Sequence, residues 1–161
     1  MTKIARNRTS TIMYTVLAAL APGLIAQAYF FGSGVLLNGI ILTVLCVLIE
    51  VSIVLVRRPV NYINELSRHF GDGSTLLTAW LIAVCLPPSL PISVLAVAAL
   101  AAIGLAKHAY GGLGQNVFNP AMVGYAVILL SFPALMATYP SAGTDGPVSY
   151  THLTLPTKLA V

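Results

Sequence analysis

Two long apolar stretches near the start of the chain limit its possible folds more than any other feature. Residues 12–31 and 35–56 each hold about 20 mainly apolar positions, the length with which an α-helix crosses the hydrocarbon core of a bilayer. Only 7% of the residues are charged and 58% are hydrophobic, whereas a soluble domain usually carries about 25% charged residues. The solvent of this chain is therefore lipid, and the sequence predicts an all-α polytopic membrane protein.

A third apolar segment, residues 74–106, is too long for one span, and the sequence LPPSLP (86–91) interrupts it. The part before the prolines is too short for a full crossing and is typical of a re-entrant or broken helix. We therefore expect a short or re-entrant helix over 74–88 and a second helix over 90–106. A last span is expected over 121–139.

Polar segments flank the membrane domain, which covers residues 12–140. Residues 1–11 are basic and predict an N-terminal tail. Lys and Arg concentrate in cytoplasmic segments, and the basic residues beside the spans agree with a cytoplasmic N-terminus. These residues are Lys3, Arg6, Arg8, Arg57, Arg58, Arg68 and Lys107, with His108 next to the last. Residues 141–161 resemble translated adapter sequence, so we expect this tail to be non-native.

Glu50 lies inside the second span, where a carboxylate is costly unless it faces a partner or a polar cavity. Thr43, Glu50 and Arg57 are seven residues apart and fall on nearly one helix face, which Cys46 joins. Two interpretations remain open. Glu50 lies on an ion path or contacts a cofactor, or it forms a structural pair with Arg57 near the membrane interface.

Two helix starts are predicted from capping residues. Asp72 or Ser74 is expected to cap the helix that begins near residue 74, although the same helix end would also favour an anionic or polar ligand group. Asn119 followed by Pro120 predicts the start of the last span, with Asn as N-cap and Pro in the first helical position.

The sequence YGGLGQNVFNPA precedes the last span and is a poor helix former. Irregular backbone at membrane depth is tolerated where protein buries it or where it lines a water-filled cavity. Gly111, Gly112 and Gly114 permit close approach of the backbone to a ligand or a helix, and Asn116 belongs to the same group. The run lacks the Lys-Ser/Thr of a phosphate-binding loop, so it is either a plain loop or a contact for a ligand.

The rest of the sequence excludes several functions. Cys46 and Cys85 lie in apolar runs without CxxC spacing, and the histidines do not form a ligand set, so no metal site is predicted. No nucleophile–base pair or carboxylate pair is visible, and catalytic residues are unknown. The cations do not form a stripe interleaved with aromatic residues, which argues against binding to nucleic acid.

Four stretches of the chain resemble the RnfD membrane proteins of the Rnf electron-transport complexes and, more distantly, the NqrB proteins of the sodium-translocating NADH:quinone reductases. The stretches are STIMYTVLAALAPGLIAQAYFFGSGVL (10–36), LCVLIE to RRPV (45–60), DGSTLLTAWLIAVCLPPSLP (72–91) and AKHAYGGLGQNVFNPAMVGYAVILLSFPA (106–134). The last stretch is the most specific. The matching positions include Glu50, Asp72, Gly111, Gly112, Gly114, Asn116, Asn119 and Pro120.

The resemblance implies a multi-pass protein of the bacterial or archaeal cytoplasmic (inner) membrane. It implies partners among the other membrane and peripheral subunits of a complex that couples electron transfer, from ferredoxin to NAD or from NADH to quinone, to sodium or proton transport. It also implies a fold of two inverted helical repeats, of which this chain is the first. Such a fragment is expected to be inactive by itself. The alternative function is a small-solute channel or transporter, because urea-channel-like proteins have a similar architecture.

The resemblance further implies a flavin. Members of the family carry FMN bound covalently to a threonine, which a flavin transferase attaches, and riboflavin is a further candidate cofactor. The attachment motif does not occur in this sequence, so no covalent flavin site is predicted in this chain. The residues expected to line a flavin, a quinone or a contact with another subunit are Gly111, Gly112, Gly114, Asn116 and Asn119.

Overall fold

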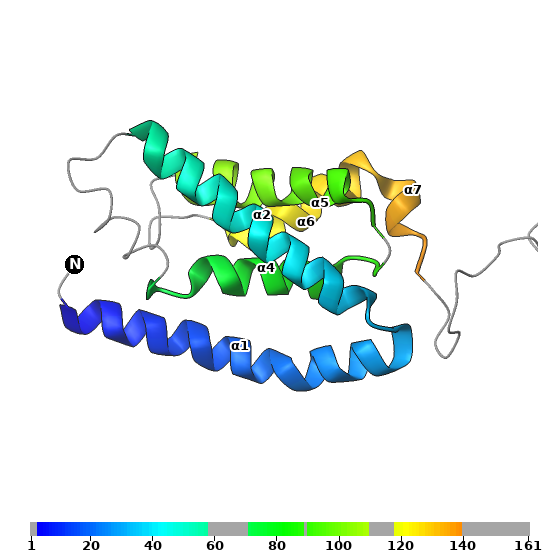
Figure 1. Ribbon diagram of the computed structural model, residues 1–161, viewed down its shortest axis with the longest axis horizontal. Helices are drawn as coiled ribbons and strands as arrows, with labels where there is room; N and C mark the ends of the chain where they lie inside the picture. The colour runs from blue at the N-terminus through cyan, green and yellow to red at the C-terminus, as the bar shows by residue number, and fades with distance from the viewer. Residues whose placement is uncertain (1–2, 58–70, 89, 110–117, 140–161) are drawn as a thin grey trace, which may run out of the picture.

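The computed structural model describes residues 3–57, 71–88, 90–109 and 118–139, and these residues are helical apart from short connections (Figure 1). The elements are α1 (Lys3–Phe31), α2 (Gly34–Arg57), α4 (Ser74–Cys85), α5 (Ile92–Ala99), the π-helix η1 (Leu100–Ala109), α6 (Pro120–Ser131) and α7 (Pro133–Met136). The prediction of an all-α protein is confirmed.

Three helices are long and apolar enough to cross a membrane. They cover Thr9–Phe31, Gly34–Arg57 and Ile92–Ala109, the last being α5 and η1 together. The helices α4 and α6 have 12 residues each and therefore span only about 18 Å. The chain thus combines full-length and short apolar helices.

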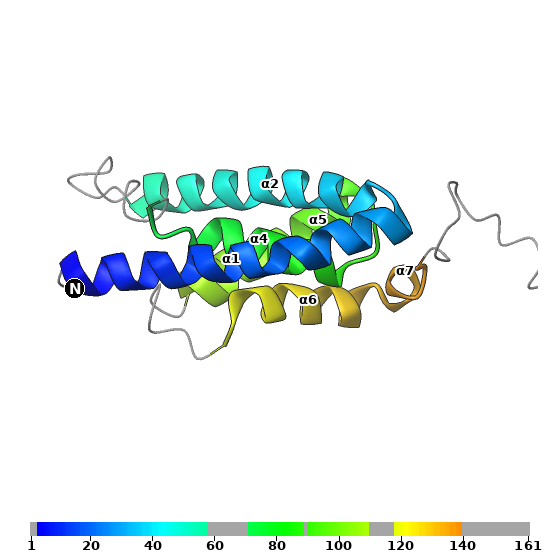
Figure 2. The same cartoon turned by 90° about the horizontal axis from the view of Figure 1, so that it is seen from below.

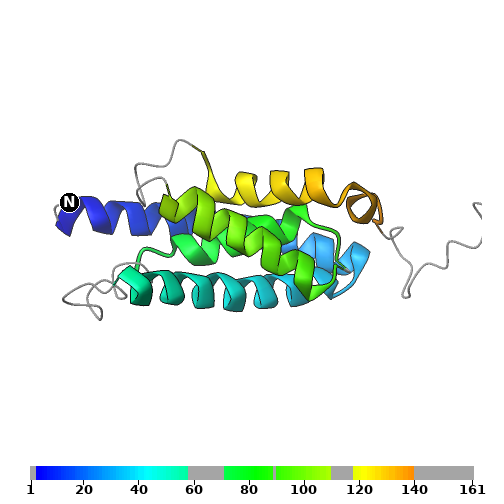
Figure 3. The ribbon, with the colours of Figure 1, turned by 90° about the horizontal axis from the view of Figure 1, so that it is seen from above.

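Successive helices run in opposite directions, and α4 and α5 lie between α2 and α6 (Figures 2 and 3). The N-terminus, the end of α2, the start of α4, the end of η1 and the start of α6 gather at one end of the bundle. The helix α2 packs on α4, α5 and η1, and α1 packs on α4 and α2. The buried core therefore lies along α4 and α5.

The break predicted at LPPSLP is present. The helix α4 ends at Cys85, Leu86 is extended with φ −95° and ψ 149°, and α5 begins directly after Pro91. Proline lacks an N–H donor and disfavours helical backbone in the residue before it. The second part continues to Ala109, three residues beyond the predicted end, and is π-helical from Leu100.

The structure departs from the sequence prediction at both ends of the membrane domain. The helix α1 begins at Lys3, within the predicted tail, because Lys and Arg are good helix formers that extend the apolar span. The predicted single span over 121–139 is divided, since α6 ends at Ser131 and α7 starts at Pro133. Phe132 precedes Pro133 and leaves the helical region, with φ −133° and ψ 54°.

Glycines allow the closest helix contacts. A Cβ on Gly124 of α6 would lie 2.9 Å from the Ala98 carbonyl oxygen and 3.1 Å from the Ala102 Cβ. A Cβ on Gly39 of α2 would lie 2.8 Å from the Trp80 ring of α4. Small residues at such points let membrane helices approach closely and pack by van der Waals contact.

We expect Gly124→Ala to destabilise the bundle by about 1–3 kcal/mol, because the methyl group must displace backbone or a neighbouring methyl. Gly23→Ala is the matched control, since a Cβ there meets no atom within 4 Å and alanine raises helix propensity by up to about 1 kcal/mol. Thermal unfolding of the detergent-solubilised protein measures both changes. Equal unfolding temperatures for the two variants would contradict the close contact between α6 and α5.

A buried ion-pair cluster as candidate functional site

One stripe of α2 is buried along its length. Asn38, Leu42, Cys46, Glu50 and Val54 are all buried and follow one another at intervals of four residues. Residues four apart lie on one face of an α-helix, and this face is the one that packs on α4, α5 and η1. The regular spacing therefore places the Glu50 carboxylate inside the bundle, where it is fully buried.

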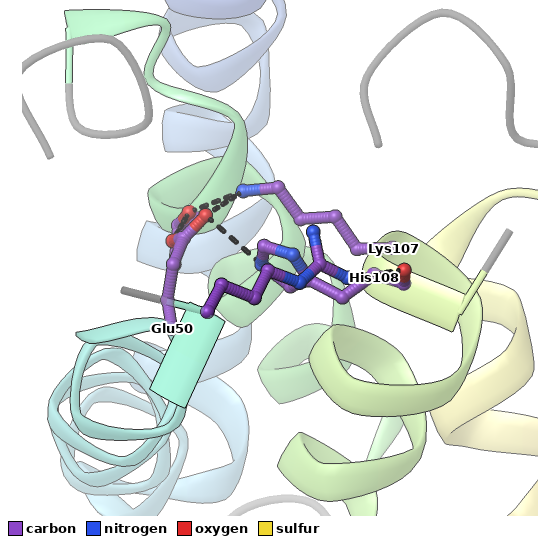
Figure 4. Close-up of polar contacts among 5 residues, drawn as sticks. Glu50, Lys107 and His108 are labelled. Carbon is purple, nitrogen blue, oxygen red and sulfur yellow. Dashed lines mark hydrogen bonds and ion pairs between the residues drawn. The ribbon is translucent and has the colours of Figure 1, made fainter. Parts of the chain in front are cut away.

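The last turn of η1 brings two basic side chains to this carboxylate (Figure 4). The Lys107 Nζ lies 2.5 Å from Glu50 Oε1, and the exposed fraction of the Lys107 side chain is 1%. The His108 Nε2 lies 3.6 Å from the same oxygen, and His108 is also buried. Both basic residues were interpreted from the sequence as topology-determining charges near the interface, but the structure places both inside the protein.

Thr75, in the first turn of α4, completes the cluster. Its hydroxyl donates a hydrogen bond to Glu50 Oε2 and accepts one of 2.8 Å from Lys107 Nζ. A buried charge pair is tolerated only when further hydrogen bonds satisfy its remaining donors and lone pairs. The cluster thus joins α2, α4 and η1 through one carboxylate, one hydroxyl and one ammonium.

Arg57, at the end of α2, contacts the cluster from its edge. Its guanidinium donates a hydrogen bond of 2.9 Å to the backbone carbonyl of His108, which is near the end of η1 where helical carbonyls lack intrahelical partners. The sequence suggested Arg57 as the structural partner of Glu50. The structure places the Lys107 ammonium at that carboxylate and the Arg57 guanidinium on the backbone of η1.

The π-helical winding of η1 explains how two consecutive residues reach one carboxylate. Consecutive side chains of an α-helix point about 100° apart, because the helix has 3.6 residues per turn. A π-helix has more residues per turn, so Lys107 and His108 diverge less. Short π-helical segments are frequent at functional sites.

A cavity of about 210 Å³ adjoins the cluster. It is lined by Tyr14, Thr43, Val47, Gly73, Thr75 and Leu76. Thr43 lies on the same α2 face as Glu50, and its hydroxyl donates to the Gly39 carbonyl at 2.7 Å. The cavity therefore reaches Thr75 from the space between α1, α2 and α4.

The cap predicted for α4 is wrong. Gly73 takes the N-cap position in the left-handed region, with φ 67°, and no side chain accepts a capping hydrogen bond. Ser74 is already the first helical residue, one position too late to act as N-cap. Asp72 Oδ1 and Ser74 Oγ are buried without a hydrogen-bond partner among the residues that the structure describes.

The structure starts α6 at Pro120, with Asn119 in the N-cap position. The Asn119 Oδ1 accepts a hydrogen bond of 3.0 Å from the backbone nitrogen of Ala121. The remaining residues of the glycine–asparagine group fall outside the described parts of the chain, so the ligand contact expected of them stays a prediction. They are Gly111, Gly112, Gly114 and Asn116.

The described residues do not fit a flavin. A second cavity, of about 290 Å³, is lined by apolar side chains of η1, the residues before α6 and α6 itself. These side chains are Leu105, Ala106, Phe118, Val123, Ala126, Val127 and Leu130. The phosphate and ring edge of FMN need hydrogen-bond donors or basic groups, and none of these side chains supplies one. No step through a flavin is therefore assigned to this part of the chain.

These features define a class of protein: a multi-pass helical membrane protein with a charged cluster inside its helix bundle. The sequence profile of the NQR2, RnfD, RnfE family matches residues 4–159. The chain belongs to this family, which confirms the resemblance found in the sequence. The matched range extends into the polar tail from residue 141 onward.

Curated relatives agree with this assignment, and their names describe the RnfD-type member of an ion-translocating oxidoreductase complex. Such a protein of Vibrio cholerae is 43% identical over 137 residues, which are 84% of this chain. Proteins with the same name from Tolumonas auensis and Sodalis glossinidius are 47% and 45% identical over 135 and 134 residues, or 84% and 83% of this chain. The chain spans 37% of the length of each of these relatives.

Sequence reasoning found Glu50 but missed Thr75, Lys107 and His108 as its neighbours. A buried carboxylate needs a partner, and that requirement could have directed attention to the few cations next to apolar segments. The sequence offers several such cations at comparable positions. Only the packing of η1 on α2 selects Lys107.

We expect Lys107→Met to destabilise the protein by about 3–5 kcal/mol, because it leaves the Glu50 carboxylate buried without its ammonium partner. The double variant Glu50→Gln/Lys107→Met should recover most of this loss, since neither charge remains. Thermal unfolding of the two single variants and the double variant gives the coupling energy. Additive effects of the two substitutions would show that the 2.5 Å pair carries no net coupling.

We expect Asn119→Ala to destabilise α6 by about 1 kcal/mol, because the Ala121 N–H loses its acceptor. Asn119→Asp is the control, since aspartate also accepts at an N-cap. Amide hydrogen exchange of Ala121 and its neighbours reports the change. Equal exchange rates in the alanine and aspartate variants would contradict the capping role.

Proposed function

We propose that this chain forms part of a membrane protein within a complex that couples electron transfer to the transport of sodium ions or protons. The relatives reported above carry names of this kind, and the helices are long enough for membrane insertion. The observation that carries the proposal for this part of the protein is the buried cluster of Glu50, Lys107 and Thr75.

The cost of the cluster supports a functional role. Replacing a buried ion pair by apolar side chains of similar volume often leaves a protein equally stable or more stable. Ionisable groups inside membrane helix bundles are rare, face the bundle interior and mark ion pathways or proton relays. Glu50 faces the interior beside a cavity that contains the Thr75 hydroxyl, which favours an ion path over a purely structural pair.

Several finer features belong to the same proposal. The segment is the first of two inverted repeats, and its N-terminus lies in the cytoplasm. The gathering of the N-terminus with the ends of α2 and η1 at one end of the bundle agrees with that orientation (Figure 3). The flavin of the complex is carried by parts of the protein that this segment does not include. Membership in this family favours the redox complex over a small-solute channel.

Glu50→Gln in the intact complex tests the proposal. We expect ion uptake per electron transferred to fall at least about tenfold, equivalent to ~1.4 kcal/mol in activation free energy, because the amide cannot exchange a charge with the transported ion. The measurement compares ion uptake and electron transfer in membrane vesicles that contain the complex.

Ser52→Ala is the matched control on the same helix. Its hydroxyl is exposed and bonds only locally, donating to the Leu48 carbonyl at 2.7 Å. The control should keep the ratio of ions to electrons. An unchanged ratio in Glu50→Gln, accompanied only by a lower unfolding temperature, would establish a structural pair and overturn the proposal.

A further inference from the structure

We infer that the oxygen atoms of Glu50 and Thr75 form a binding site for one monovalent cation, with which the ammonium group of Lys107 competes. The inference rests on the proposed function in ion transport and names the site and its occupant. Sodium is the probe of choice, since small hard cations prefer carboxylate and hydroxyl oxygens over nitrogen or sulfur ligands.

The position of the Lys107 ammonium identifies the site. Its Nζ lies 2.5 Å from Glu50 Oε1 and 2.8 Å from Thr75 Oγ1, so two oxygens from different helices converge on one cationic atom (Figure 4). An inorganic cation at this point would use the same two oxygens. The ammonium and the cation therefore exclude each other.

The charge of the site selects a single monovalent cation. Among the described residues, Glu50 is the one carboxylate that contacts the Lys107 ammonium. When the cation replaces the ammonium at that carboxylate, the local charge balance is retained. A divalent ion would leave an uncompensated positive charge in the bundle interior, which is costly in a low dielectric.

A polar route leads to the site from the end of the bundle where α4 begins. Asp72 Oδ1 and Ser74 Oγ are buried without hydrogen-bond partners among the described residues, and Ser74 is 93% buried because its exposed fraction is 7%. Both directly precede Thr75 in the chain. Thr75 also lines the cavity of about 210 Å³ between α1, α2 and α4. Unsatisfied buried oxygens beside a cavity can replace part of the hydration shell of an entering cation.

The start of α4 limits how tightly the cation is held. The N-terminus of a helix carries a partial positive charge, which stabilises the Glu50 carboxylate and weakens the binding of a cation near Thr75. Transport requires binding that is favourable enough for entry and weak enough for release. The competing ammonium of Lys107 acts in the same direction.

Cation binding by the purified full-length protein tests the inference. Thermal unfolding is measured in sodium, lithium, potassium or choline chloride at one ionic strength, because a ligand that binds the native state raises its stability as the ratio of ligand concentration to Kd increases. Binding of radioactive sodium measures the affinity directly. The wild-type protein should be stabilised by sodium relative to choline.

Two sets of variants separate the site from general stability. Lys107→Gln should tighten sodium binding at least about tenfold, because the competing charge is removed while an amide still donates to both oxygens. Thr75→Val should weaken sodium binding by about tenfold, because one of the two oxygens is lost. Thr75→Ser keeps that oxygen and should restore most of the response.

The inference is overturned if sodium binding is absent from the wild-type protein, survives in Thr75→Val, or is unchanged in a folded Lys107→Gln. If Lys107→Gln fails to fold, the comparison of Thr75→Val with Thr75→Ser decides alone. Failure of the cation site is distinguishable from failure of the proposed function. Loss of ion transport in Glu50→Gln without any sodium binding would support proton transport through Glu50 and remove only the cation site.

Discussion

The buried carboxylate of Glu50 is the constraint on which the arrangement of the bundle depends. A charge in an apolar interior must be compensated within a few ångströms, and the compensation comes from two other helices. The Lys107 ammonium of η1 and the Thr75 hydroxyl of α4 both contact it. These contacts fix the register of α2 against α4 and η1, which apolar side chains alone would specify less sharply.

Other features serve the same meeting point. The α-helix of α5 widens into the π-helix η1 before its end, which lets Lys107 and His108 approach one carboxylate. The prolines between α4 and α5 reverse the chain so that both helices pack on α2. Close glycine contacts at Gly39 and Gly124 bring α2 and α6 against this pair. A costly polar cluster is thus held by an apolar, closely packed frame.

This frame relates the family assignment to a mechanism. Membership in the NQR2, RnfD, RnfE family connects the chain with relatives named for ion translocation. The geometry adds a candidate location at which a transported ion interacts with protein oxygens. Because Lys107 already supplies a positive charge at that point, ion binding and the position of η1 are coupled. Such coupling is a physical basis for linking transport to events elsewhere in a complex.

The sequence by itself determined the solvent, the helical class, the break at LPPSLP and the start of α6 at Pro120. Each follows from local properties: apolar length, missing proline donors and the capping preference of Asn119. Only the tertiary structure selected Lys107 and Thr75 as partners of Glu50, put Gly73 in the cap position of α4 and wound η1 as a π-helix. These features depend on which helix faces meet, and residues 25 and 57 positions apart in the chain carry no local signal of their contact.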